Sequence, residues 1–178
     1  MKSYPQAPLP LITEDEIQII VRRLGTEITA HYRDCPRQLV VVGLLKGAFI
    51  FMADLVRRLE LPVVVDFLGV SSYGDTAVSS GDIRLTMDLA TDIAGRDVLL
   101  VEDIVDTGIT IEAVRRLLTG RQPRSLRVCA FLSKPDCRRT DVQVDFVGRE
   151  IENAFVVGYG MDYAGDFRHL PFLGTIDR

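Results

Sequence analysis

Apolar residues near the start of the chain recur at helical spacing. Thr13 and Glu16 have the form of a capping box, in which each residue satisfies a backbone donor of the other. One apolar face follows, made of Ile17, Ile20, Val21, Leu24 and Ile28. Pro36 closes this unit, because proline cannot continue a helix. The spacing therefore predicts a helix that begins after Thr13 and ends before Pro36.

Short β-branched runs and helical patterns alternate through the rest of the chain. Strands are predicted at 39–42, 63–68, 83–87, 98–101 and 126–132, with short ones at 144–147 and 155–157. Helices are predicted at 47–59, with Phe49, Met52, Leu55 and Val56 on the apolar side, and at 111–118. This alternation predicts an α/β fold with a mostly parallel sheet covered on both faces. Ligands of such sheets bind at the carboxyl ends of the strands.

An acidic segment, VLLVEDIVDTGITI at residues 98–111, follows one of these strands. Its carboxylates, Glu102, Asp103 and Asp106, stand before a predicted helix start, which is a favourable site for phosphate. The carboxylates repel a bare phosphate, but they suit a ligand that also carries sugar hydroxyls or Mg²⁺, as a ribose phosphate does. Alternatively, Asp106 simply caps the helix. Capping explains one acid, and leaves two buried charges in need of partners.

Two lysines and a long polar loop are further candidates. Lys46 and Lys134 each follow a predicted strand, although either is also typical of a solvated surface side chain. Residues 70–82 form a polar loop of the length that lids and binding loops have. Phe155, by pattern alone, is a core residue of a buried strand. The two histidines have no cysteine or histidine at ligand spacing, so no zinc site is expected.

Composition narrows the class of protein. The 178 residues suffice for one domain with a substantial core, and the formal net charge of −4 gives no overall case for binding nucleic acid. Three cysteines without a CxxC pair indicate reduced thiols and a cytoplasmic protein. The first residues, Met-Lys-Ser-Tyr-Pro, lack the apolar core of a secretory signal. No apolar run is long enough for a membrane span.

Several short motifs of the chain resemble those of a known family. Residues 101–110, VEDIVDTGIT, resemble the phosphoribosyl-pyrophosphate motif of type I phosphoribosyltransferases. Further motifs resemble the 6-oxopurine (hypoxanthine-guanine) branch in their order along the chain, namely Leu45-Lys46-Gly47, Ser72-Tyr73, Ser133-Lys134-Pro135, and 155–162 with Arg168. The resemblance covers about residues 13–175. It implies the type I fold as a single domain, 1–178, with a core at about 36–140, a small hood from 1–35 and 143–178, and a lid at 70–82.

The resemblance also implies an activity and its residues. The 5-phosphoribosyl group of phosphoribosyl pyrophosphate would pass to hypoxanthine and/or guanine, giving IMP or GMP and pyrophosphate in purine salvage. Asp106 would be the catalytic acid/base. Phosphoribosyl pyrophosphate would be bound by Leu45, Lys46, Gly47, Glu102, Asp103, Asp106, Thr107, Gly108, Ile109, Thr110 and Arg168. The purine would be bound by Lys134, Phe155, Val156 and Asp162, under a lid carrying Ser72 and Tyr73. Mg²⁺ would be held by Glu102, Asp103 and Asp162.

One departure and several alternatives accompany this interpretation. Ile109 stands where some family members have lysine, so one charge near the phosphate is missing. A xanthine-preferring or other purine transferase, a regulatory nucleic-acid-binding protein on the same fold, and a phosphoacceptor receiver domain are the alternatives. The family suggests a homodimer or homotetramer. The sequence does not rank hypoxanthine, guanine and xanthine, and it does not identify the cation or any feedback regulation.

Overall fold

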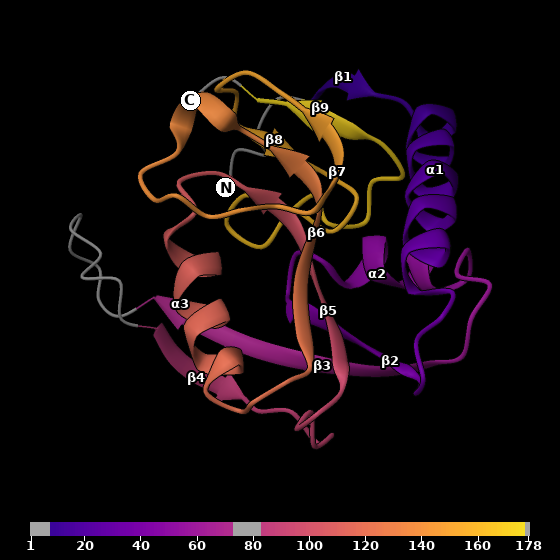
Figure 1. The fold of residues 1–178 in the computed structure, drawn as a ribbon. Coiled ribbons are helices and arrows are strands. Elements are labelled where there is room, and N and C mark those ends of the chain that lie inside the picture. Colours follow the sequence, from indigo (N-terminus) through magenta and orange to yellow (C-terminus); the bar gives the residue numbers. More distant parts are fainter. Residues whose placement is uncertain (1–7, 73–82, 177–178) are drawn as a thin grey trace.

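A six-stranded sheet forms the centre of the computed structural model, which describes residues 8–72 and 83–176 (Figure 1). Its strand order is β4-β3-β2-β5-β6-β7, and β4 runs antiparallel to β3 whereas the other neighbours are parallel. The strands are β2 (Leu39–Leu45), β3 (Val63–Ser72), β4 (Ile83–Met87), β5 (Asp97–Val105), β6 (Ser125–Ser133) and β7 (Phe146–Glu150). The predicted α/β architecture with a mostly parallel sheet is confirmed.

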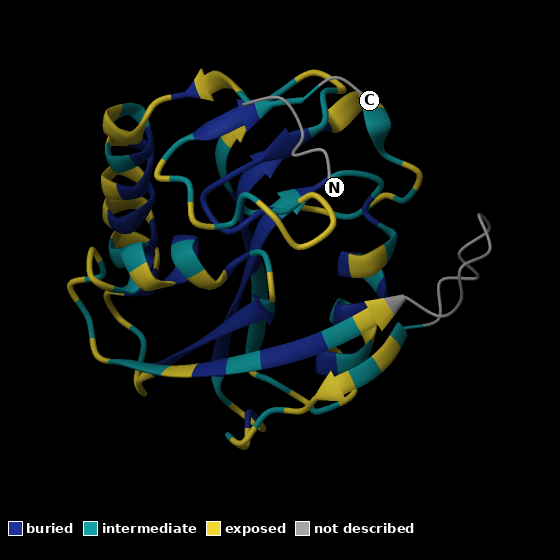
Figure 2. Ribbon diagram, turned by 180° about the vertical axis from the view of Figure 1, so that it is seen from behind, coloured by how far each residue is buried: buried dark blue, intermediate teal, exposed yellow. Residues whose placement is uncertain are grey.

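Helices cover both faces of this sheet (Figures 1 and 2). The helices are α1 (Glu14–Tyr32), α2 (Phe49–Val56) and α3 (Ile109–Thr119). Side chains alternate across a strand, so Leu99 and Val101 of β5 join the core under α1 and α2, whereas Val98 and Leu100 join the core under α3. Within the described ranges, no helix is both long enough and apolar enough to cross a membrane.

A second, three-stranded antiparallel sheet is built from the two ends of the described chain. It contains β1 (Leu9–Ile12), β9 (Leu173–Thr175) and β8 (Val156–Val157), in the order β1-β9-β8. In Figure 1 it lies beyond one end of the large sheet, above the strand ends of β5 and β6. The strand pattern of the sequence did not predict β1 or β9. Strand β7 joins the large sheet, although the chain from 143 onward was expected in the hood.

The observed helix boundaries confirm one prediction made from sequence periodicity and correct another. The capping box is confirmed, since the Thr13 N–H donates to Glu16 Oε2 at 2.9 Å and the Glu16 N–H donates back to Thr13 Oγ1 at 3.3 Å. The prediction for α2 was wrong in length and in part of its apolar face. The helix spans 49–56 and not 47–59, and Phe49 is 42% exposed whereas Phe51 is fully buried. The inner face follows positions 51, 52 and 55, which leaves Phe49 at its edge.

A buried carboxylate fixes the start of β5. Asp97 accepts hydrogen bonds from Arg124 (Nε, 3.0 Å), from the Ser125 hydroxyl and from the Cys35 thiol (both 2.5 Å). Burial raises the pKa of Asp97, but these hydrogen bonds outweigh it and hold the value at about 2. The same strand carries the acidic residues of the candidate site at its other end, so this anchor sets their register.

Candidate active site

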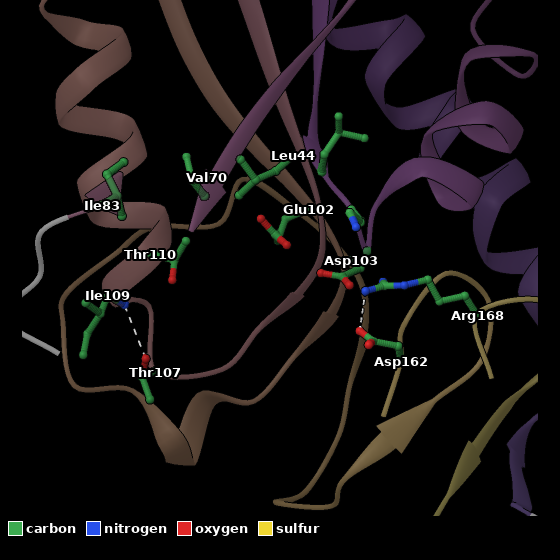
Figure 3. Close-up of a pocket in the computed structure, with 13 residues that line it drawn as sticks. Leu44, Val70, Ile83, Glu102, Asp103, Thr107, Ile109, Thr110, Asp162 and Arg168 are labelled. Atoms are coloured by element: carbon green, nitrogen blue, oxygen red, sulfur yellow. Dashed lines mark hydrogen bonds and ion pairs between the residues drawn. The ribbon is translucent and has the colours of Figure 1, made fainter. Parts of the chain in front are cut away.

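A cavity of about 380 Å³ opens at the carboxyl ends of β2, β3 and β5 (Figure 3). Its walls combine the β2–α2 turn, the end of β5, the start of α3 and a loop near the C-terminus. The lining residues are Leu44, Leu45, Lys46, Gly47, Val70, Ile83, Glu102, Asp103, Thr107, Ile109, Thr110, Asp162 and Arg168. The structure thus brings together most residues that the family motifs assign to phosphoribosyl pyrophosphate.

Two of the three acids lie within β5 and not in the turn after it. The strand continues to Val105, and Glu102 pairs in register with Ala130 of β6, which corrects the strand end predicted at residue 101. Glu102 is 9% exposed, and among the described residues its Oε2 has no hydrogen-bond partner. Burial and the neighbouring Asp103 raise the pKa of Glu102 well above its usual range. A buried acceptor without a partner is costly, so this oxygen is ready for a donor or a cation.

The β2–α2 turn packs directly on Asp103. A Cβ atom added to Gly47 would lie 1.6 Å from Asp103 Oδ2, so no larger residue fits without moving the carboxylate. The preceding peptide bond, between Leu45 and Lys46, is cis, and the Lys46 side chain is exposed at the cavity. The close approach places a backbone turn, an ammonium group and a carboxylate around one space.

A C-terminal loop beside the β2–α2 turn completes the cavity. Asp162 and Arg168 form an ion pair with 2.5 Å between Asp162 Oδ1 and Arg168 Nη2, and the Arg168 Nη1 donates to the Gly160 carbonyl at 2.6 Å (Figure 3). Gly160 has a φ of +102°, and a Cβ there would lie 2.2 Å from the Gly47 carbonyl. Two glycines 113 positions apart in sequence therefore let this loop rest on the β2–α2 turn.

The start of α3 carries no side-chain cap. Its N-cap is Gly108, with a φ of +83°, so the alternative in which Asp106 caps the helix is wrong. The Ile109 N–H makes only a long contact of 3.5 Å with Thr107 Oγ1, and Thr110 is exposed at the cavity. The first N–H groups of a helix have no partner within the helix, so this end presents backbone donors for an anion.

Asp106 faces a second cavity, next to the first. This space, of about 650 Å³, is lined by Asp106, Lys134, Asn153, Ala154, Phe155, Thr175 and Ile176. Lys134 is only 5% exposed, and its Nζ lies 2.9 Å from Asp106 Oδ2. The Phe155 ring makes an edge contact with Tyr163, with centroids 5.7 Å apart. The third acid is therefore paired with a buried ammonium group, and it also lines a smaller cavity of about 200 Å³ together with Glu102 and Asp103.

The other predicted residues have the following positions. Asp162 was grouped with the purine residues as well as with the metal, but it lines the first cavity with Glu102 and Asp103. Val156 is buried in β8, next to Phe155. The backbone of Ser72 ends β3, whereas Tyr73 and the rest of the lid lie outside the described residues. Sequence reasoning missed the lining residues Val70, Asn153, Ala154, Thr175 and Ile176, for which the pattern carries no signal.

The donor set fits a magnesium ion that arrives with its ligand. Among residues 8–72 and 83–176, no group of three His, Cys, Asp or Glu residues could hold an ion by itself. Mg²⁺ usually takes one or two protein carboxylates together with substrate phosphates and water. Glu102 and Asp103, with the unpartnered Glu102 Oε2, offer that kind of partial set.

Comparison with known proteins decides the family. The sequence profile of the phosphoribosyl transferase domain matches residues 13–164. This chain belongs to the phosphoribosyltransferase family. It is 48% identical over 166 residues to a hypoxanthine phosphoribosyltransferase of Salmonella typhimurium, covering 93% of both chains. It is 45% identical to a hypoxanthine-guanine phosphoribosyltransferase of Bacillus subtilis, covering 93% of this chain and 91% of the relative.

Solved structures agree with the sequence match. A hypoxanthine phosphoribosyltransferase from Staphylococcus aureus superposes with a TM-score of 0.90 at 40% identity, over 94% of this chain and 90% of the other. The predicted family and the type I phosphoribosyltransferase fold are thereby confirmed, and the receiver-domain alternative is wrong.

Proposed function

We propose that this phosphoribosyltransferase transfers the 5-phosphoribosyl group of phosphoribosyl pyrophosphate to hypoxanthine and/or guanine. The products are IMP or GMP and pyrophosphate, and the role is purine salvage. The observation that carries the proposal is the buried Lys134 paired with Asp106 at 2.9 Å in a cavity beside the acidic end of β5. Such a pair can donate to an oxo group and accept a ring proton of the same base. The names of the relatives support the same substrates.

The sugar is bound by the acids of β5. The Glu102 and Asp103 carboxylates accept hydrogen bonds from the ribose hydroxyls, or they would hold Mg²⁺ together with Asp162. When bound, Mg²⁺ neutralises charge on the pyrophosphate leaving group. The two carboxylates of β5 also offset positive charge that develops on the ribose as the bond from C1 to the pyrophosphate oxygen breaks.

The phosphates are bound by backbone and cations. The turn 106–110 and the hydroxyls of Thr107 and Thr110 surround the 5′-phosphate at the start of α3. Lys46 and the Gly47 backbone bind the pyrophosphate, and Arg168 adds a second cation beside it. The isoleucine at 109 contributes backbone and no charge, so the 5′-phosphate here depends on N–H groups more than on cations.

Residues of the second cavity hold the base and accept its proton. Lys134 donates to the purine O6 atom, Phe155 stacks on the ring, and the Val156 backbone contacts its edge. As the purine nitrogen bonds to C1 and pyrophosphate leaves, Asp106 accepts the proton from N7. An adenine amino group cannot accept a hydrogen bond from Lys134, so adenine leaves a buried ammonium unpaired and should be strongly rejected.

Three further parts of the proposal concern the surroundings of the site. Because residues 70–72 belong to β3, the lid of this proposal, with Tyr73, is confined to the part of 70–82 after Ser72, and it would exclude the water that hydrolyses the activated sugar. The enzyme works as a homodimer or homotetramer, which sedimentation measurements test. We place it in the cytoplasm, in keeping with free thiols at Cys35, Cys129 and Cys137.

The deciding experiment measures pyrophosphate release from phosphoribosyl pyrophosphate and Mg²⁺ with hypoxanthine, guanine, xanthine and adenine in parallel. We expect release with hypoxanthine or guanine and not with adenine. Preference for xanthine would change the assignment to a xanthine-preferring phosphoribosyltransferase. Binding of phosphoribosyl pyrophosphate without release from any base would contradict the enzymatic proposal and favour a regulatory protein. The Asp106→Ala variant controls for release by a contaminant.

A further inference from the structure

Three successive backbone carbonyls in the turn between β5 and α3 are held from one side. The Val105 carbonyl accepts from the Lys134 N–H at 3.0 Å, and the Thr107 carbonyl accepts from the Arg139 N–H at 2.9 Å. Between them, the Asp106 carbonyl accepts from the Arg138 guanidinium, with Nη1 at 3.1 Å. All three donors come from the segment 134–139, which follows β6.

This anchoring decides where the opposite edges of the peptides point. In a trans peptide the C=O and N–H groups are coplanar and point in opposite directions. A carbonyl held toward 134–139 therefore turns the next N–H away from that segment. The N–H groups of Asp106, Thr107 and Gly108 are oriented in this way, on the stretch of chain that we assign to the 5′-phosphate.

Arg138 supplies the anchor that a substitution can remove, because the other two donors are backbone N–H groups. Its guanidinium is also tied at the other end, where Nη2 donates to the Ser133 hydroxyl at 2.9 Å. Ser133 is 4% exposed and immediately precedes Lys134. Burial lowers the pKa of Arg138, and the Asp106 charge partly offsets this effect. Arg138 thus bridges the strand end that presents Lys134 and the turn that presents Asp106.

The same segment also supports the turn by packing. A Cβ added to Gly108 would lie 2.6 Å from Thr140 Oγ1, 2.7 Å from Val142 Cγ1 and 3.7 Å from Arg138 Cδ. The Gly108 backbone therefore rests on residues 138–142, and it has little room to rotate. Loss of the Arg138 hydrogen bond would free the Asp106 carbonyl, which among these three carbonyls is the one held by a side chain.

We propose that Arg138 is a positioning residue for phosphoribosyl transfer, an inference that rests on the proposed function. It holds the Asp106–Thr107 peptide so that the Thr107 N–H faces the 5′-phosphate while the Asp106 carboxyl faces the base. Its predicted effect appears in the use of phosphoribosyl pyrophosphate and in turnover, and much less in affinity for the purine. A residue with a purely structural role would lower the stability and leave the kinetic constants of the folded protein unchanged.

The test compares Arg138→Met with Arg139→Met in the full-length protein. Arg139 is exposed, and its contact to Thr107 uses the backbone N–H, so its substitution removes the same charge without removing an anchor. We expect kcat/KM for phosphoribosyl pyrophosphate to fall by about 10- to 100-fold in Arg138→Met, the factor typical for a lost hydrogen bond to a charged group. The KM for the base should change far less, and Arg139→Met should behave as wild type.

Two further variants keep the inference falsifiable. Arg138→Lys retains one donor and should recover part of the loss, and Ser133→Ala, which frees the other end of the guanidinium, should cause a smaller loss of the same kind. Wild-type constants in Arg138→Met, an equal loss in Arg139→Met, or an equal rise in both KM values would overturn the proposal.

Calorimetric binding of ribose 5-phosphate provides a readout that is independent of turnover. Weaker binding to Arg138→Met than to wild type is expected, and equal binding would contradict the positioning role. If the wild type releases no pyrophosphate with any purine, the proposed function fails. The binding comparison would still decide whether Arg138 orients the phosphate turn.

Discussion

The two partners of the Lys134–Asp106 ion pair differ in solvent exposure, and this difference predicts how variants of each residue behave. The Lys134 side chain is 6% exposed, whereas that of Asp106 is 45% exposed. Removing Asp106 leaves a buried ammonium without its carboxylate. Removing the Lys134 charge leaves a carboxylate that water can still reach. Asp106→Ala should therefore destabilise the fold, and Lys134→Met should not.

The size of the effect follows from the burial of each partner. Breaking a fully buried pair costs about 3 to 5 kcal/mol, and exposed pairs contribute about 0 to 1 kcal/mol. Because one partner is half-exposed, we expect Asp106→Ala to lower the free energy of unfolding by about 1 to 2 kcal/mol. In a domain of this size that change lowers Tm by about 2 to 8 °C. Lys134→Met should change the free energy by less than about 0.5 kcal/mol, or raise it.

The assay is a double-mutant cycle read by urea unfolding and by steady-state kinetics. The double variant should be more stable than Asp106→Ala, because no unpaired ammonium remains. In activity the two variants should differ in kind. Lys134→Met should raise the KM for the purine, and Asp106→Ala should lower turnover by about 10²- to 10⁴-fold. Additive stability effects, or a Lys134→Met variant less stable than Asp106→Ala, would refute the electrostatic reasoning.

Three more predictions concern other carboxylates and one glycine. Because the folded pKa of Glu102 is raised, the stability linked to its protonated form is present below its usual value of 4.5 and is lost as the pH rises above it. The Tm of Glu102→Gln should therefore rise relative to that of wild type as the pH increases above 4.5, while the variant loses affinity for phosphoribosyl pyrophosphate. The pKa of Asp97 is lowered from 3.8 to about 2, so its contribution of about 2 kcal/mol to the free energy of unfolding is present above pH 3.8 and is lost as the pH falls through 2. The stability difference between wild type and Asp97→Asn should therefore disappear between pH 3.8 and pH 2 in acid unfolding curves. A constant difference would show that titration is not involved. Gly47→Ala should displace the Asp103 carboxylate and raise the KM for phosphoribosyl pyrophosphate by at least about 10-fold, whereas Gly120→Ala, where an added Cβ meets no atom closer than 3.4 Å, should keep wild-type kinetics.

Local chemistry made parts of the fold predictable. The capping box at Thr13 and the apolar face after it depend on neighbours within one helix, so the sequence alone was sufficient for α1. Strands β1 and β9 could not be found in this way, because each has at most four residues and they pair with each other from the two ends of the described chain. The end of β5 was predicted too early, since charged residues usually end a strand. Here the pairing with β6 continues through Glu102 to Val105.

In the candidate site, too, residues with a local sequence signal were predicted and residues placed by tertiary contacts were not. Glu102, Asp103 and Lys46 were found because their residue types and positions after strands are chemically informative. Their common cavity confirms that the strand ends converge, although the role of each residue stays a prediction. Arg138 gave no signal, because an arginine in a loop looks like a solvated side chain until its two hydrogen bonds are seen. Partners chosen by tertiary structure cannot be read from local pattern.

The contact between Gly160 and the Gly47 carbonyl has a consequence for how the chain matures. A nascent chain ending near residue 150 would contain every strand of the large sheet and most of its core. It would lack the loop that carries Asp162 and Arg168, and therefore one wall of the cavity that Lys46, Glu102 and Asp103 also line. This cavity can therefore be completed only after the loop has been synthesised. A ligand bound in the cavity that both segments line would contact one segment made early and one made late, and its binding energy would stabilise both.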